Sequence, residues 1–134
     1  VRKLLKTFNA PILKRVPIAF TTAKDSKNIQ SVLDLAGSIY KQSTTEIPTP
    51  KLNKALEIIK EEKWGSVKRS KGRPKIYYAT QLAVNPVTIL MFVNNPLLFD
   101  DRYKRSIASR LQELLGIEEV PMRLLARARS SGRR

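Results

Sequence analysis

The densest cluster of functional side chains in the sequence is cationic. Five of the eight residues from 68 to 75 are Lys or Arg, and Gly72 and Pro74 stand among them, so this segment is predicted to be a loop. Lysine and arginine neutralise phosphate groups and release their counterions on binding. The candidate phosphate-binding residues of this basic loop are Lys68, Arg69, Lys71, Arg73 and Lys75. The competing interpretation is a solvated surface loop.

A second basic group is expected on the last strand of the chain. From residue 120 to about residue 129, one set of alternate positions is apolar and the other set consists mostly of arginines. This pattern is typical of a strand with one face on helices and one basic face. The basic stripe consists of Arg123, Arg127 and Arg129. Arginine on an exposed strand binds phosphate, but it also aids solubility and protects a sheet edge, so both roles stay open.

Two adjacent tyrosines, Tyr77 and Tyr78, follow the basic loop in an expected strand. Strand alternation would place their rings on opposite faces of the sheet. Aromatic rings stack on unpaired bases, which makes Tyr77 a candidate RNA contact. The alternative is that one ring packs in the core while the other covers the sheet.

The composition limits the chemistry that is available. Lys and Arg number 26 against 11 Asp and Glu, so the formal net charge is +15, which favours a polyanionic partner such as RNA, DNA or an anionic membrane surface. The sequence has no Cys and no His, which excludes disulfides, Cys-ligated metals and Ser-His-Asp or Cys-His catalysis. We expect no catalytic residue and no metal site. No apolar stretch approaches the roughly 20 residues of a membrane span.

The first group of elements is incomplete. Residues 16–22 are expected to form a short apolar strand buried on both faces, and residues 28–41 an amphipathic helix. The candidate N-cap residues of this helix are Asp25, Ser26 and Asn28. One strand cannot form a sheet, so its neighbours are expected upstream in a longer chain or on a partner. Residues 43–50 contain two prolines and are predicted to be an extended, stiff linker.

The second group of elements follows an α-β-β-(α)-α-β order. A first helix is expected to follow the N-cap Thr49 and to stop at Gly65, and two strands over 76–83 and 87–94 are expected to be joined by a turn. A helical turn over 96–99 follows. The last elements are a helix over 102–115, capped by Asp100 or Asp101 and ended by Gly116, and a strand over 120–129. Helices on one face of a three-stranded sheet form a small α+β sandwich. This order matches a KH-type RNA-binding domain.

Several motifs within this second group occur in one order. They are Ile47–Asn53 (IPTPKLN), Lys75–Gln81 (KIYYATQ), Phe92–Pro96 (FVNNP), the helix Tyr103–Leu115 with Gly116, and Val120–Leu124 (VPMRL). Together they resemble the Der (EngA) family of ribosome-assembly GTPases, from about Ile47 to Arg127. The resemblance implies that residues 1–46 are the C-terminal remnant of a Ras-like GTP-binding domain and that residues 47–134 are a KH-like RNA-binding domain. The expected fold class is therefore α+β: a KH-like three-stranded sheet packed by helices (α-β-β-α-β), preceded by a partial α/β GTPase-domain fragment.

The resemblance also implies a function. This part of the protein would bind rRNA during assembly and maturation of the large ribosomal subunit, and it would dock on the upstream GTP-binding domains of the same protein. The parent protein would use GTP/GDP and Mg²⁺, and Thr22, Ala23 and Lys24 would contact the guanine at the end of a strand. The alternative for these three residues is an ordinary exit from a strand. The chain contains neither G-x-x-x-x-G-K-[ST] nor Asn-Lys-x-Asp, so by itself it is expected to bind no cofactor and to hydrolyse no GTP.

The position of the usual RNA-gripping loop departs from other KH domains. These domains hold the RNA backbone with a Gly-x-x-Gly loop between two helices. Here that position is Phe99-Asp100-Asp101-Arg102, and two carboxylates repel phosphate. The Der family is similar in lacking this loop, so RNA is expected to bind elsewhere on the module.

Other functions remain as alternatives. The first is a stand-alone structural or assembly subunit of an organellar ribosome without GTPase activity. The absence of acidic residues before Asp25 would also suit an organellar presequence, although a first residue other than Met fits a trimmed protein better. The compartment is thus expected to be the bacterial cytoplasm, a mitochondrion or a plastid, and the protein a monomer. DNA binding fits the charge but no helix-turn-helix or zinc-finger motif is visible, and no basic amphipathic helix indicates a membrane surface.

Overall fold

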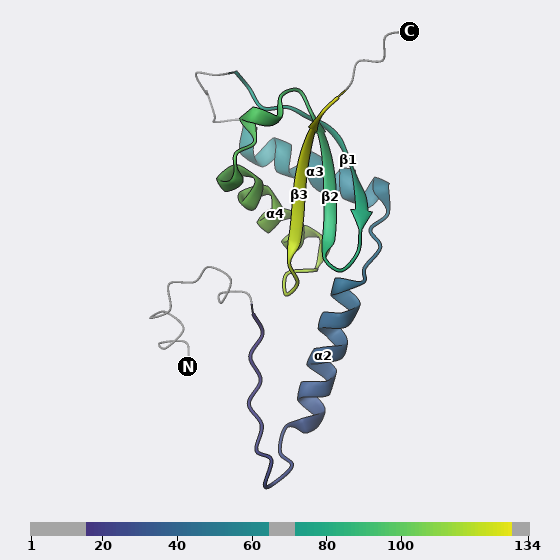
Figure 1. The fold of residues 1–134 in the computed structure, drawn as a ribbon, viewed down its shortest axis with the longest axis vertical. Coiled ribbons are helices and arrows are strands. Elements are labelled where there is room, and N and C mark those ends of the chain that lie inside the picture. Colours follow the sequence, from purple (N-terminus) through teal and green to yellow (C-terminus); the bar gives the residue numbers. More distant parts are fainter. Residues whose placement is uncertain (1–15, 65–71, 130–134) are drawn as a thin grey trace.

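The computed structural model describes residues 16–64 and 72–129 (Figure 1). Its elements are α2 (Ile29–Ser43), α3 (Thr49–Trp64), β1 (Ile76–Ala83), β2 (Val87–Val93), the 3-10 helix η2 (Pro96–Leu98), α4 (Asp101–Leu115) and β3 (Met122–Ala128). The order from α3 onward confirms the predicted KH-like α+β fold. Among the described helices, none is long and apolar enough to cross a membrane.

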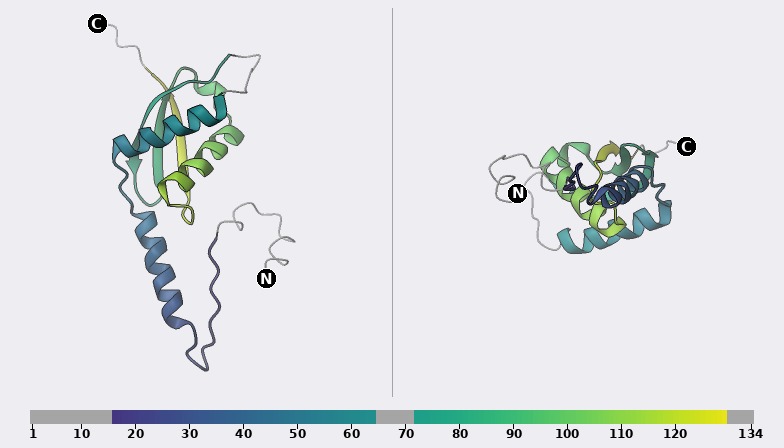
Figure 2. Two further views of the ribbon diagram at one scale, coloured as in Figure 1. Left: turned by 180° about the vertical axis from the view of Figure 1, so that it is seen from behind. Right: turned by 90° about the horizontal axis from the view of Figure 1, so that it is seen from below.

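The three strands form one mixed sheet in the order β1-β2-β3. β1 and β2 pair antiparallel through the predicted hairpin, whereas β3 pairs parallel with β2. A parallel pair needs a crossover connection, and α4 supplies it. Helices α3 and α4 cover one face of the sheet, and no described helix covers the other (Figures 1 and 2).

The hydrophobic core lies between this sheet and the two helices. Alternate residues of β2 are buried, starting at Val87 and ending at Val93, as strand periodicity requires. The largest fully buried side chains are Leu52, Leu56, Val87, Ile89, Met91, Val93, Ile107 and Leu111. Each such side chain contributes roughly 1.5–3 kcal/mol relative to full exposure. The core therefore holds the sheet rigid beneath its uncovered face.

Helix α3 also completes the hydrogen bonds of the edge strand β1. The side chain of Asn53 donates to the carbonyl oxygen of Ala79 and accepts from its N–H, each over 2.9 Å. Ala79 is fully buried, so its backbone groups would otherwise lack a partner. The helix begins at Thr49, one residue before the predicted start, and the carbonyl of Pro48 accepts from the N–H of Leu52. Its predicted stop at Gly65 lies outside the described residues.

Helix α4 ends at Leu115 as predicted, and it begins at Asp101, one residue before the predicted start. A carboxylate oxygen of Asp100 accepts from the N–H of Tyr103 over 2.7 Å, which is an N-cap bond. Gly116 ends the helix in the left-handed region, with φ of 71°, where a residue without a Cβ is favoured. The buried Gln112 then donates to the carbonyl of Val120 over 2.6 Å and ties the following loop to the helix.

The expected buried strand over residues 16–22 is wrong for this chain. The segment is extended, but it forms only an isolated bridge between Thr22 and Lys27, and Phe20 is 62% exposed. No neighbouring strand exists among the described residues, so its apolar side chains have nothing to pack against. Asn28 precedes α2 with a φ of 63°, and its side chain makes no cap bond; it donates instead to the carbonyl of Phe20.

Helix α2 projects from the end of the sandwich (Figures 1 and 2). The linker after it is joined to β1 by one side chain: Gln81 accepts from the N–H of Ile47 over 2.7 Å and donates to the carbonyl of Thr45 over 2.9 Å. The side chain of Gln42 donates to a carboxylate oxygen of Glu119 over 2.8 Å. These bonds, rather than the prolines alone, hold the linker in place.

Candidate nucleic-acid interface

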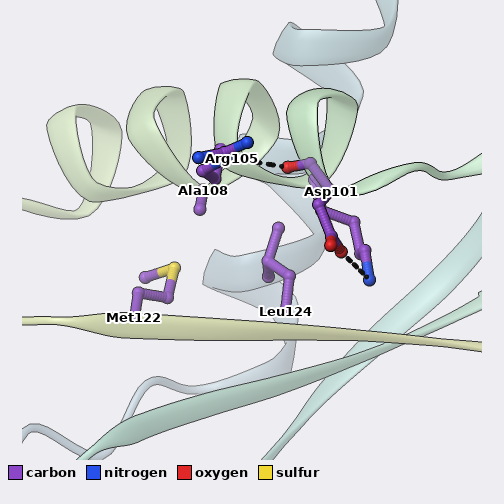
Figure 3. A pocket seen from close by; sticks show the side chains of 6 residues that line it. Asp101, Arg105, Ala108, Met122 and Leu124 are labelled. Carbon is purple, nitrogen blue, oxygen red and sulfur yellow. Dashed lines mark hydrogen bonds and ion pairs between the residues drawn. The ribbon is translucent and has the colours of Figure 1, made fainter. Parts of the chain in front are cut away.

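An open groove of about 350 Å³ lies between α4 and β3 (Figure 3). It is lined by Asp101, Lys104, Arg105 and Ala108 from α4 and by Met122 and Leu124 from β3. The helix supplies the charged groups because these residues recur at spacings of three and four, which place them on one side of a helix. The strand supplies apolar side chains because Met122 and Leu124 are on the core-facing side of β3.

The one carboxylate of this groove is paired with one of its two cations. The Lys104 ammonium lies 2.9 Å from a carboxylate oxygen of Asp101, and Arg105 Nε donates to the carbonyl of Asp101 over 3.2 Å. The hydrogen bond from Lys104 and its positive charge, with a smaller effect from Arg105, lower the pKa of the Asp101 carboxyl. An incoming phosphate would therefore meet an ionised carboxylate. The N-terminus of α4 is likewise occupied, since Asp100 caps it.

A second surface lies at the end of the sheet where β1 begins and β2 and β3 end. The ammonium nitrogen of Lys75 is 5.3 Å from the centroid of the Tyr77 ring, and the guanidinium carbon of Arg129 is 5.2 Å from the same centroid. Both distances are within the range of a cation–π contact, worth about 0.5–1 kcal/mol at an exposed site. We call Lys75, Tyr77 and Arg129 the sheet-end cluster.

Backbone hydrogen bonds position this cluster. The side chain of Asn94 accepts from the N–H of Lys75 over 2.9 Å and donates to the carbonyl of Arg73 over 3.0 Å. The N–H of Asn94 donates to the carbonyl of Lys75, and the N–H of Arg129 donates to that of Val93, each over 3.0 Å. The last turn of the basic loop and the end of β3 are thus both tied to the end of β2.

The basic stripe of β3 continues from the cluster along the uncovered face. Arg123 and Arg127 are exposed, and their register partners on β2 are Thr88 and Phe92. None of the three strands contains Asp or Glu. Among the described residues, no carboxylate is within ion-pairing distance of Arg123, Arg127 or Arg129. This face therefore carries positive charge that no neighbouring carboxylate neutralises.

The helical side of the lobe has a different charge pattern. Helices α3 and α4 carry both cations and carboxylates, and several of these form ion pairs. Arg110 bridges Glu62, at 2.6 Å, and Glu113, at 2.9 Å. The hydrogen bonds to Glu62 and then to Glu113 raise the pKa of the Arg110 guanidinium above its ordinary value. In the second group of elements, neighbouring carboxylates therefore neutralise less of the positive charge on the sheet side than on the helical side.

The predicted site residues fall into three groups. Lys68, Arg69 and Lys71 lie outside the described residues. Lys75, Tyr77 and Arg129 come together in the sheet-end cluster, with Arg73 leading into it and Arg123 and Arg127 following on the same face. The candidate guanine-binding residues Thr22, Ala23 and Lys24 are exposed in the turn before α2, at the far end of that helix (Figure 1).

The prediction that Tyr77 and Tyr78 occupy opposite faces is wrong. The register with β2 shifts between Ile76 and Tyr78, so Tyr77 is the extra residue of a bulge. The Tyr78 ring stacks on Phe92, with centroids 4.4 Å apart and an interplanar angle of 20°. The Tyr77 ring meets Arg129, which follows Arg127 on the uncovered face. Both rings therefore contribute to that face.

Sequence reasoning missed Phe92 as a surface residue. Alternation along β2 could have found it, because Val87, Ile89, Met91 and Val93 are buried and Phe92 falls on the opposite side. The apolar character of every position in β2 except Thr88 hid this alternation. The bulge had no such signal, since it depends on how β1 pairs with β2.

Comparison with known proteins gives one family. Residues 46–127 match the model of the KH-domain-like region at the C-terminus of EngA bacterial GTPase enzymes. The chain is 34% identical over 119 residues to a protein named GTPase Der from Natranaerobius thermophilus, which covers 89% of this chain and 27% of that protein. It is 36% identical over 118 residues to GTPase Der from Persephonella marina, covering 87% and 26%.

A third relative, GTPase Der from Nitratidesulfovibrio vulgaris, is 37% identical over 112 residues, with 83% of this chain and 22% of that protein covered. The chain thus spans about a quarter of the length of these relatives. The matched residues include all of α3, β1, β2 and α4, β3 up to Arg127, and every buried residue of the core. By this match and by its fold, the chain belongs to the family of KH-domain-like regions found at the C-terminus of EngA bacterial GTPases.

Proposed function

We propose that this chain is the C-terminal part of a GTPase that acts in assembly of the large ribosomal subunit, and that residues 47–134 bind rRNA. The observation that carries the proposal is the sheet-end cluster, in which two cations flank the Tyr77 ring next to the basic loop. An RNA strand presents phosphates and bases in alternation, and cations beside an aromatic ring suit both. The name of the relatives, GTPase Der, supports the GTPase part of the proposal.

The charge distribution favours the sheet over the groove as the RNA site. A phosphate in the groove would lie near the ionised Asp101, whereas the sheet-end cluster and the basic stripe have no carboxylate partner among the described residues. Unpaired surface cations release the most counterions when they meet phosphate. RNA would therefore bind from the end of the sheet, where the basic loop ends, along β3.

For residues 1–46 we propose the end of a GTP-binding domain, with Thr22, Ala23 and Lys24 near the guanine. In the parent protein that domain would hold GTP or GDP with Mg²⁺, and the rRNA-binding lobe would dock on it. The exposed apolar side chains of residues 16–20 and of α2 support this idea, because a soluble domain normally covers such a surface. The bacterial relatives favour the bacterial cytoplasm as the compartment.

The first experiment compares binding of the chain to purified large and small ribosomal subunits over a series of salt concentrations. We expect preferential binding to the large subunit. The double substitution Arg127→Gln/Arg129→Gln is expected to weaken binding and to flatten the log–log salt slope by roughly 0.7–0.9 per lost phosphate contact.

A matched control removes the same charge from the helical side. Lys51→Gln/Lys54→Gln changes two exposed cations of α3 and is expected to leave the binding of the large subunit nearly unchanged. Equal losses in both double variants would mean that only net charge matters. Equal binding to both subunits would contradict the role in the large subunit.

A further inference from the structure

The uncovered face of the sheet carries an apolar and aromatic surface in addition to its arginines. The register places Tyr78, Phe92 and Arg127 in one row across the three strands, and Thr80, Leu90 and Leu125 in the next. We call these six residues the open face. Its rows are perpendicular to the strands, so each row brings together side chains from β1, β2 and β3.

Part of this apolar surface is accessible to solvent. Tyr78 is 44% exposed and Leu125 is 47% exposed, although both belong to strands whose other face is buried. The Tyr78 ring is already stacked face to face on Phe92, so each ring covers one face of the other and the pair forms a rigid aromatic platform before any ligand arrives. A rigid aromatic platform loses little conformational entropy when a flat ligand stacks on it.

The arginines lie along one side of the platform. Arg127 is the register partner of Phe92, and adjacent strands are about 4.8 Å apart. The Arg127 side chain therefore leaves the backbone directly beside Phe92. Arg123 precedes it on the same face, and the sheet-end cluster follows it. The strands contain no Asp or Glu, so the surface is complementary to a polyanion that also has flat apolar parts.

We propose that the open face binds single-stranded RNA, with an unpaired base stacked on the outer side of the Tyr78–Phe92 pair and the neighbouring phosphates on the arginines of β3. This rests on the proposed rRNA-binding function and adds the site and the form of the RNA. A duplex hides the faces of its bases and offers only its phosphates to such a surface, whereas a single strand offers both. A protein surface is the alternative occupant, but it would not explain why the arginines of this face have no carboxylate partner among the described residues.

The test measures the affinity of the full chain for an oligouridine of about 12 nucleotides, for a duplex of the same length, and for inorganic polyphosphate. Tyr78→Ser should raise the Kd for the single strand about five-fold or more, since base stacking typically contributes at least that much. The same variant should leave the Kd for polyphosphate unchanged, because polyphosphate has no bases. Arg127→Gln should weaken the binding of both ligands.

Two controls separate stacking from a general loss of structure. Tyr78→Phe keeps the ring and is expected to bind the single strand like the unmodified chain. Leu97→Ser removes an apolar side chain that is 90% exposed and lies outside the open face, and it should have no effect on any ligand. Thermal unfolding of each variant shows whether the fold is retained.

The outcomes distinguish this inference from the function on which it rests. If Tyr78→Ser binds the single strand normally while Arg127→Gln/Arg129→Gln binds it weakly, the lobe binds RNA by charge alone and the stacking surface is refuted. If Tyr78→Ser loses only its binding to ribosomal subunits and not to the oligonucleotide, the open face contacts protein. If the unmodified chain binds neither RNA nor subunits, both proposals fail.

Discussion

Helices α2 and α4 are both 15 residues long and amphipathic, but they differ completely in burial. In α4, Ile107, Leu111 and Leu115 are buried against the sheet and α3. In α2 no residue is buried, and Leu33 is 60% exposed although it belongs to the apolar stripe. An apolar stripe therefore predicts that a helix needs a partner surface, and only the rest of the structure decides whether this chain supplies that surface.

The same contrast separates the two groups of elements. Residues 47–129 contain their own core, and the buried side chains of this core all come from this part of the chain. The extended segment 16–20 and α2 add only Ile39, which is partly buried, to its edge. Stability should therefore depend strongly on the second group and weakly on the first.

The largest expected effect comes from a cavity in the core. Leu111→Ala removes a fully buried side chain and should lower the free energy of unfolding by about 2–5 kcal/mol. Leu33→Ala, the matched substitution in α2, should change it by less than about 0.5 kcal/mol because that side chain is exposed. Urea unfolding followed by circular dichroism measures both. Similar losses in the two variants would show that α2 is packed against something in solution.

A smaller effect is expected at the edge strand. Asn53→Leu leaves the buried N–H and carbonyl of Ala79 without partners and should cost about 1–3 kcal/mol. Lys54→Leu, at the next and exposed position of α3, is the control and should be nearly neutral. The same unfolding experiment applies, and unchanged stability of Asn53→Leu would mean that water or another group replaces the amide.

The smallest effect is expected at the junction of the two groups. Gln81→Ala removes the acceptor for the N–H of Ile47 and the donor to Thr45, at a cost of about 0.5–1.5 kcal/mol. Because the linker would open locally, hydrogen exchange at the amide of Ile47 should become faster while exchange in β2 stays unchanged. Gln30→Ala removes only an exposed bond to Asp34 within α2 and serves as the control. Equal exchange at Ile47 in all three proteins would show that Gln81 does not hold the linker.

Local signals predicted most of the second group. The carboxylate before α4, Gly116 after it, and the hairpin between β1 and β2 are each determined by residues a few positions apart. Such signals act through the backbone of their own segment, so no knowledge of distant residues is required. The positions of Arg123 and Arg127 on an exposed face followed from the two-residue period of a strand in the same way.

The main errors concern contacts between distant residues. Residues 16–22 have the composition of a buried strand, yet burial needs neighbouring strands that the described residues do not contain. Gln81 and Asn53 look like ordinary polar residues until the linker and the edge of β1 come close to them. The side on which Tyr77 lies depends on the register of β1 against β2.

By itself, the sequence determined the strong positive charge, the absence of Cys and His chemistry, the order of the second group of elements and the positions of its caps, because these depend on composition and on neighbours in the chain. Tertiary structure decided that Lys75, Tyr77 and Arg129 form one cluster and that Tyr78 and Phe92 form one platform. The physical reason is that β2 lies between β1 and β3, so residues more than 50 positions apart meet only once the sheet has formed.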